Sequence, residues 1–244
     1  MPKKPKKLHK TGGVGKRGKV IKKKGVTKKR KRPAPGYVVT SALSGATVTQ
    51  YRRIRGSKAA TTSQKRRAGE AMGESGAVAY LQERTGNDLD LVHPTKTEPF
   101  DLSLDDGTAW DSAIAFNGNG VADVMTWDGE TLHVIEAKGG GSTLKKASQF
   151  GRIQKYNPDT GDMLPQAVRQ SANPPRLSQG TLEYLTDIAH NMWNSKSADN
   201  RTDAGQAILD AIENGTIEYV PVSTRVEEGD STATVSVMDP DEED

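Results

Sequence analysis

Residues 121–138 run Val-Ala-Asp-Val-Met-Thr-Trp-Asp-Gly-Glu-Thr-Leu-His-Val-Ile-Glu-Ala-Lys, and this stretch decides the fold. Two runs rich in apolar and β-branched residues flank an Asp-Gly pair, which is a strong signal for a β-hairpin. We take Asp128-Gly129 as a two-residue turn, so that Trp127 pairs with Glu130. The stretch therefore predicts two antiparallel strands of a sheet.

Three charged side chains of this hairpin are predicted to share one face. Side chains alternate along a strand, so Val134, Glu136 and Lys138 point to the same side. The assumed turn places Asp123 opposite Val134, diagonal to Glu136 and within reach of it. Two carboxylates and one ammonium on one face are suited to holding a hard cation beside a positive charge. An ordinary surface hairpin with one ion pair is the alternative.

The order Asp123, then Glu136-Ala137-Lys138 across a hairpin, resembles the PD-(D/E)xK nuclease superfamily, which has the restriction-endonuclease-like fold. Ala122 stands where the family usually has Pro. The resemblance implies that Asp123, Glu136 and the Ala137 carbonyl bind Mg²⁺, or Mn²⁺ in its place. It also implies that Lys138 orients or deprotonates the attacking water and offsets charge on the phosphate. The Gly139–Gly141 run allows another backbone to approach closely.

A helix is predicted over residues 62–85, capped by Thr61, Thr62 or Ser63 and ended by Gly86. Its glycines at 69, 73 and 76 weaken the helix and suggest close packing against a neighbour. The phrase Gly73-Glu-Ser-Gly-Ala-Val-Ala-Tyr-Leu81 is similar to the Gly-Glu-x₅-Tyr-Leu opening of RecB-like members of the superfamily. That resemblance implies that Glu74 joins the metal site. Glu70, one turn earlier on the same face, is the alternative residue for this role. A Glu74 that only faces solvent is the alternative to any role in the site.

A second clear helix is predicted over residues 181–194, with Thr181 as its cap and a buried stripe of Leu, Ile, Ala and Met. Its lead-in, Ser178-Gln-Gly-Thr-Leu-Glu-Tyr-Leu185, resembles a stretch of restriction-endonuclease-like domains from bacterial polymorphic toxins. The resemblance implies that Gln179 lies near the active site. It also implies a toxin or antibacterial effector nuclease, with a cognate immunity protein as partner.

The remaining pattern completes an α/β domain. Further elements are expected at 89–93, 110–116, 216–226 and 232–237 as strands and at 202–213 as a helix, while 145–178 is mostly irregular. The expected fold is a restriction-endonuclease-like core, with a mixed β-sheet and a central β-hairpin flanked by helices. Half of the basic residues after position 67 lie in 145–178, where they either contact a phosphate backbone or face solvent.

Charge divides the chain into a basic arm and an acidic body. Residues 1–67 contain 23 Lys and Arg and no Asp or Glu, which leaves 12 basic and 31 acidic residues for 68–244. We expect 1–36 to be a disordered basic arm, 37–61 a linker or accessory segment, 62–238 the nuclease domain and 239–244 an acidic tail. DNA is the expected partner of the arm. Charge that only aids solubility is the alternative.

Several classes of protein are disfavoured. The chain has no cysteine, which excludes disulfides and thiolate zinc sites, and no apolar run reaches the length of a membrane span. No apolar stretch of a signal peptide follows the basic N-terminus, so we expect a cytoplasmic protein or one delivered into a target cell by a non-cleaved route. The four histidines lack zinc-protease spacing, and His133 is expected opposite Val124, packed on the face away from Glu136.

Three functions remain open from the sequence. A Mg²⁺-dependent deoxyribonuclease of the toxin type is the first, and a DNA-repair or phage-type nuclease is the second. The third is a noncatalytic nucleic-acid-binding protein that acts through the basic arm.

Overall fold

The structure is a computed structural model that describes residues 37–38, 43, 45–86, 91–92, 120–140, 142, 152–195, 201–226 and 232–239. The predicted arm at 1–36 and the predicted strand at 110–116 lie outside these residues, as does most of the acidic tail. Gly141 of the predicted glycine run also lies outside them.

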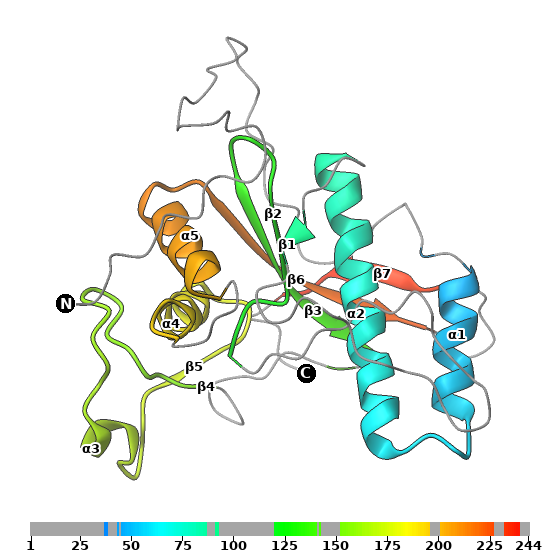
Figure 1. Cartoon of the computed structure of the whole chain (residues 1–244), viewed down its shortest axis with the longest axis horizontal. Coiled ribbons are helices and arrows are strands. Elements are labelled where there is room, and N and C mark those ends of the chain that lie inside the picture. The colour runs from blue at the N-terminus through cyan, green and yellow to red at the C-terminus, as the bar shows by residue number, and fades with distance from the viewer. Residues whose placement is uncertain are drawn as a thin grey trace.

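A five-stranded mixed sheet forms the centre of the molecule (Figure 1). Its order is β1-β2-β3-β6-β7; β3 and β6 run parallel, and the other neighbours are antiparallel. The strands are β1 (Leu91–Val92), β2 (Val124–Trp127), β3 (Leu132–Gly139), β6 (Ile217–Arg225) and β7 (Thr234–Val237). The β2–β3 hairpin therefore places β3 at the middle of the sheet.

Helices cover both faces of this sheet (Figure 1). They are α1 (Gly45–Gly56) and α2 (Thr62–Thr85) on one side, and α4 (Leu182–Trp193) and α5 (Arg201–Glu213) on the other. A two-stranded sheet, β4 (Arg152–Ile153) with β5 (Arg176–Leu177), leads out to the short helix α3 (Gln166–Arg169). The expected α/β class, a mixed sheet flanked by helices, is confirmed. Its assignment to the restriction-endonuclease-like fold remains a prediction.

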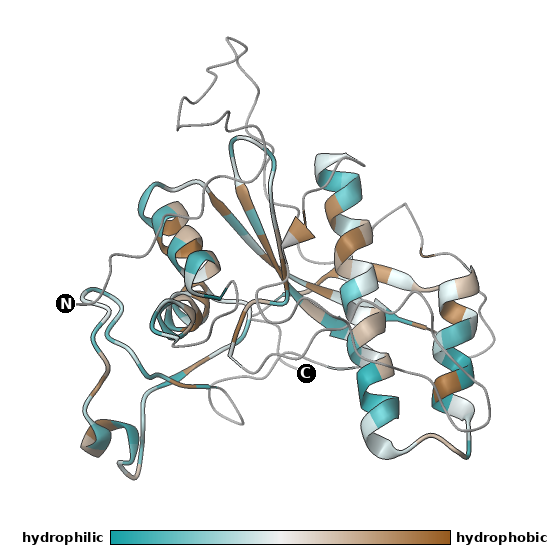
Figure 2. Ribbon diagram, in the orientation of Figure 1, coloured by the Kyte–Doolittle hydropathy of each residue, from teal (hydrophilic) through white to brown (hydrophobic). Residues whose placement is uncertain are grey.

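Two apolar cores form because β3 buries both of its faces. Leu132 and Val134 pack with α4 and α5, whereas Ile135 packs with α2 residues that include Tyr80 and Leu81. The alternation of the strand thus sends even-numbered side chains toward α4 and odd-numbered ones toward α2. Figure 2 shows the resulting hydrophobic residues along the central strands. It follows that Glu136 and Lys138 lie on the α4 side.

Local sequence explains where α2 begins and ends. Thr61 and Gln64 form a capping box: the Thr61 hydroxyl accepts from the Gln64 N–H at 3.2 Å, and the Gln64 side chain accepts from the Thr61 N–H at 2.9 Å. At the other end Gly86 has a φ of 99°, which favours glycine. The predicted bounds of 62–85 are therefore confirmed. No helix among the described residues has the length and apolar character needed to cross a bilayer.

The glycines of α2 allow its backbone to touch β3, as the sequence suggested. A Cβ on Gly139 would lie 2.0 Å from the Gly69 carbonyl oxygen and 2.4 Å from the Gly73 nitrogen. A Cβ on Gly73 would lie 2.8 Å from the Gly139 nitrogen. No side chain fits between the two elements, so these glycines set the distance between α2 and the end of β3.

Helix α1 was not predicted. Its sequence is rich in charge and lacks a strong apolar stripe, yet Val48, Tyr51 and Ile54 are buried against α2 residues such as Met72. The segment 37–61 thus packs on the helix that opens the predicted nuclease domain. Val38 also forms an antiparallel bridge to Ser236 of β7, so both Val38 and α1 contact the body.

We expect Gly139→Ala to lower the free energy of unfolding by about 2–3 kcal/mol, because the added methyl group meets main-chain atoms that have little room to move. Thermal unfolding followed by circular dichroism measures the change. Gly56→Ala is the matched control, since a Cβ there meets nothing within 4 Å. Equal melting temperatures for the two variants would show that α2 and β3 are not in backbone contact.

Candidate active site

The β2–β3 hairpin has a longer turn than the sequence suggested. Trp127 pairs with Leu132 rather than with Glu130, so the predicted two-residue turn was wrong and the register is shifted by two residues. The cause is the Asp128 side chain. Its Oδ1 accepts from the N–H groups of Glu130 and Thr131 at 2.9 and 2.7 Å, which stabilises a four-residue connection.

The shift brings Asp123 closer to Glu136 than expected. Val124 pairs with Ile135, so the next position of the ladder sets Asp123 opposite Glu136 instead of opposite Val134. A shift of two residues leaves every side chain on its predicted face, because strand side chains alternate with a period of two. Asp123 Oδ2 accepts a hydrogen bond from the Ala137 N–H at 2.8 Å, which ties it to the middle of Glu136-Ala137-Lys138.

Three donors surround the Glu136 carboxylate, which is buried. The Lys138 ammonium donates to Oε1 at 2.6 Å and the Gln179 amide donates to the same oxygen at 3.0 Å. The Tyr219 hydroxyl donates to Oε2 at 3.2 Å. Asp123, Glu136, Lys138 and Gln179 are thus brought together in one place.

Gln179 reaches Glu136 because the turn before α4 is held at two points. Thr181 caps α4 by accepting from the Tyr184 N–H at 3.3 Å, as predicted. Gly180, with a φ of 89°, hydrogen-bonds through its backbone to the Tyr219 hydroxyl. The Gln179 amide also donates to the Tyr184 hydroxyl at 3.1 Å. Both ends of the Glu136 carboxylate are therefore linked to the 179–180 turn.

The two tyrosines of this site were missed from the sequence. Tyr219 is on β6, beside β3 in space but 83 residues from Glu136 in the chain. Tyr184 lies in the predicted α4 helix outside the buried stripe named from the sequence, and the spacing of that stripe gives no sign of a polar role for the Tyr184 hydroxyl. Burial, followed by the charge of Glu136, raises the pKa of both hydroxyls, so both remain neutral donors or acceptors.

The charges of the site depend on one another. The surrounding protein and the negative charge of Glu136 raise the pKa of Asp123 to about 7, against the opposing effects of Lys138 and the Ala137 N–H. Burial alone would lower the pKa of Lys138, but the carboxylates of Glu136 and Asp123 outweigh it and raise that pKa. Lys138 is therefore an ammonium at neutral pH. Asp123, with a pKa of about 7, is present there in both its protonated and its ionised form.

The two carboxylates predicted on α2 differ in their surroundings. Glu74 is buried, which removes the solvent-facing alternative. Glu70 is exposed, 3.7 Å from Arg66, and its negative charge contributes to the raised pKa of Asp123. Whether Glu74 joins the site stays a prediction.

The donor set fits a magnesium ion with several water ligands. Asp123, Glu136 and the Ala137 carbonyl, the ligands that the resemblance implies, would supply hard oxygen atoms, and Mg²⁺ in proteins is commonly held by one or two carboxylates. The mutual repulsion that raises the pKa of Asp123 would be relieved by a cation. Within the described part of the chain, no cluster of three or more His, Asp or Glu suited to a metal is present. A site of two carboxylates is consistent with that finding.

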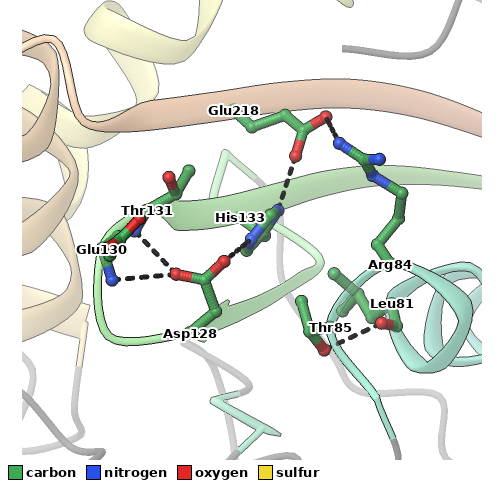
Figure 3. Close-up of polar contacts among 8 residues, drawn as sticks. All are labelled: Leu81, Arg84, Thr85, Asp128, Glu130, Thr131, His133 and Glu218. Carbon is green, nitrogen blue, oxygen red and sulfur yellow. Dashed lines mark hydrogen bonds and ion pairs between the residues drawn. The ribbon is translucent and has the colours of Figure 1, made fainter. Parts of the chain in front are cut away.

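A second charged group lies on the other face of the hairpin (Figure 3). His133 is buried between two carboxylates, with Nε2 2.9 Å from Asp128 Oδ2 and Nδ1 2.7 Å from Glu218 Oε2. Arg84 of α2 donates to Glu218 Oε1 at 3.0 Å. His133 pairs with Thr126 rather than with the predicted Val124, but the predicted face is confirmed. Its role here is to connect the hairpin, β6 and α2.

Comparison of the chain with protein-family models, with curated proteins and with solved structures found no significant match.

We expect replacement of His133 by Gln to destabilise the protein by about 2 kcal/mol at mildly acidic pH, because it removes the cation that the buried Glu218 shares with the exposed Asp128, while Glu218 keeps its bond from Arg84. Burial alone would lower the pKa of His133, but its bonds to Asp128 and Glu218 raise it. A raised histidine pKa adds stability that is complete below the unfolded pKa of about 6.5 and is lost as pH rises through the native pKa.

The ionisation of Asp128 sets the lower pH limit of this stability difference. Burial opposes ionisation, but the bonds from His133, Thr131 and Glu130 hold the pKa of Asp128 at about 2, so its contribution is lost as pH falls toward that value. The stability difference is therefore largest between roughly pH 4 and 6.5. Urea unfolding at several pH values measures it. In the control His190→Gln the trend reverses, because burial lowers the pKa of His190. A flat difference for His133→Gln would contradict the network.

Proposed function

We propose that this protein is a metal-dependent nuclease that hydrolyses phosphodiester bonds of DNA. The observation that carries the proposal is the convergence of Asp123, Glu136 and Lys138 on one side of a hairpin, with Gln179 bonded to the same carboxylate as Lys138. These are the residues that carry the resemblance to PD-(D/E)xK nucleases. The position of the hairpin at the centre of a mixed sheet supports the same assignment.

Each residue has a part that follows from its surroundings. Asp123 and Glu136 would hold Mg²⁺ together with the Ala137 carbonyl, and the ion would supply Lewis-acid activation of water and phosphate. Gln179 and Tyr219 keep the Glu136 carboxylate in one orientation by donating to its two oxygens. The raised pKa of Lys138 supports a role in orienting water and offsetting phosphate charge rather than in removing a proton.

The biological setting is a further part of the proposal. The similarity of the Gln179 region to polymorphic-toxin domains favours an effector nuclease, and such a protein needs an immunity partner that covers the site. A DNA-repair or phage-type nuclease uses the same chemistry. The noncatalytic alternative draws on the 16 Lys and Arg of residues 1–36, which favour binding of nucleic acid without cleavage.

Purified protein is expected to nick and linearise supercoiled plasmid with Mg²⁺ or Mn²⁺ and to do nothing in EDTA. Alanine at Asp123, Glu136 or Lys138 should each lower the cleavage rate by roughly 100-fold or more, since each removes a charge from the reacting centre. Lys58→Ala is the control, because Lys58 is an exposed lysine in the connection between α1 and α2. Circular dichroism checks that the variants are folded.

Full activity in a folded Lys138→Ala protein would refute this mechanism, and so would cleavage in EDTA. Binding of plasmid by wild-type protein with no cleavage in either metal would support the noncatalytic alternative.

A second measurement separates the carboxylates of α2. Glu74→Gln is expected to reduce cleavage far more than Glu70→Gln, because Glu74 is buried and occupies the position of the Gly-Glu-x₅-Tyr-Leu phrase that the resemblance links to the metal. Rates at several Mg²⁺ concentrations show whether metal affinity has changed. A larger loss in Glu70→Gln would assign that role to Glu70, and equal activity would leave Asp123, Glu136 and Lys138 as the minimal site.

A further inference from the structure

The segment from β4 to β5 extends away from the central sheet and carries α3 at its far end (Figure 1). Its base is fastened to α4 by one buried carboxylate. Asp187 Oδ2 accepts from the Arg152 side chain at 2.6 Å, and Asp187 Oδ1 accepts from the N–H groups of Lys155 and Tyr156 at 2.7 and 2.8 Å. This extension is therefore held in a defined position on the body of the protein.

Three cations of the extension come together. The Leu164 N–H donates to the Lys155 carbonyl at 2.8 Å, and the Leu164 carbonyl accepts from the Arg169 side chain at 2.9 Å. Lys155 and Arg169 both bond Leu164, Lys155 through its carbonyl and Arg169 through its side chain, and Arg152 lies three residues before Lys155 in the chain. Burial and the charges of Arg152 and Arg169 lower the pKa of Lys155, against the effect of Asp187. The positive charges of both arginines therefore act on Lys155.

Among the described residues, the carboxylate that pairs with this group does not balance its positive charge. Within the described part of the chain, the pair between Asp187 and Arg152 is the one ion pair that any of these three cations makes. The other oxygen of Asp187 accepts hydrogen bonds from two backbone N–H groups. The Arg152 Nη2 is buried and has no hydrogen-bond partner in the described part of the chain. One carboxylate facing three cations leaves an excess of positive charge that an anion would relieve.

The extension that carries this cation group, Arg152, Lys155 and Arg169, joins the candidate active site at both of its ends. The Arg152 guanidinium lies against Gly120, three residues before Asp123; a Cβ at Gly120 would be 2.6 Å from Arg152 Nη1. At the other end of the extension, β5 leads directly into Gln179, which donates to Glu136 at 3.0 Å. The two ends of the extension are therefore fixed near the two carboxylates that the proposed nuclease uses, Asp123 and Glu136.

We infer that Arg152, Lys155 and Arg169 bind a backbone phosphate of the nucleic-acid strand whose scissile bond lies at Glu136. This inference rests on the proposed function and adds a contact that positions the substrate outside the reacting centre. Arg and Lys side chains are the usual partners of backbone phosphates, and such contacts set orientation without reading sequence. The rest of the body is strongly acidic, so a local positive group beside the site is suited to guiding a polyanion there.

The test is binding of a fluorescein-labelled DNA duplex by the full-length protein in EDTA, measured by anisotropy at several salt concentrations. The variant is Lys155→Gln with Arg169→Gln. Arg152 is kept, because its bond to Asp187 fastens the extension. The control is Arg53→Gln with Lys58→Gln, which removes the same charge from exposed residues around α1 on the other side of the sheet.

The variant is expected to flatten the slope of log K against log salt by about one unit or more, as the loss of phosphate contacts requires, while the control changes it less. An unchanged slope, or an equal change in the control, would overturn the inference. The inference would also be overturned if the variant binds the duplex as wild type does but inorganic phosphate no longer competes with the duplex for binding. The group would then bind a small anion rather than the DNA backbone. If the double variant melts early, Lys155→Gln alone is measured by the same criteria.

The result is independent of cleavage. A shallower slope in a protein that never cuts plasmid would refute the nuclease and retain the phosphate contact. Cleavage of plasmid by the wild-type protein, together with an unchanged salt slope in the variant, would retain the nuclease and refute the phosphate contact.

Discussion

Helix α2 and strand β3 meet through their backbones at Gly73 and Gly139, and the arrangement of the sheet and its candidate site depends on that contact. A methyl group on either residue would lie under 3 Å from main-chain atoms of the other. Glycine weakens a helix, so the α2 glycines are a local cost that close packing offsets. The consequence is positional: the end of β3 that carries Glu136 and Lys138 is held directly against the helix that carries Glu70 and Glu74.

A strand that is covered on both faces cannot leave its charges to solvent. β3 nevertheless carries a glutamate, a lysine and a histidine, and a buried charge is tolerated only with partners. Glu136 accepts a hydrogen bond from Lys138 of its own strand, and further bonds from Gln179 and Tyr219 of distant elements. His133 obtains Asp128 and Glu218 on the opposite face. The same central strand thus has one charged network toward α4 and another toward α2.

Features that depend on short-range chemistry were predictable. The bounds of α2 followed from the Thr61 cap and Gly86, and α4 from its apolar stripe and the Thr181 cap. The common face of Asp123, Glu136 and Lys138 followed from strand alternation. The exact register did not, because the Asp128 side chain stabilises a longer turn than the Asp-Gly pair suggested. The face survived that error since the shift was by two residues.

By itself the sequence determined the element types, the hairpin, the face on which the charged side chains lie and the division into a basic arm and an acidic body. These are set by propensity, capping and periodicity within a few residues of chain. Only the tertiary structure showed that Tyr219 supports Glu136, that α1 packs on α2, and that the charges of Arg152 and Arg169 act on Lys155. Such contacts join residues far apart in the chain, and their energy depends on burial and charge that arise after the elements have packed.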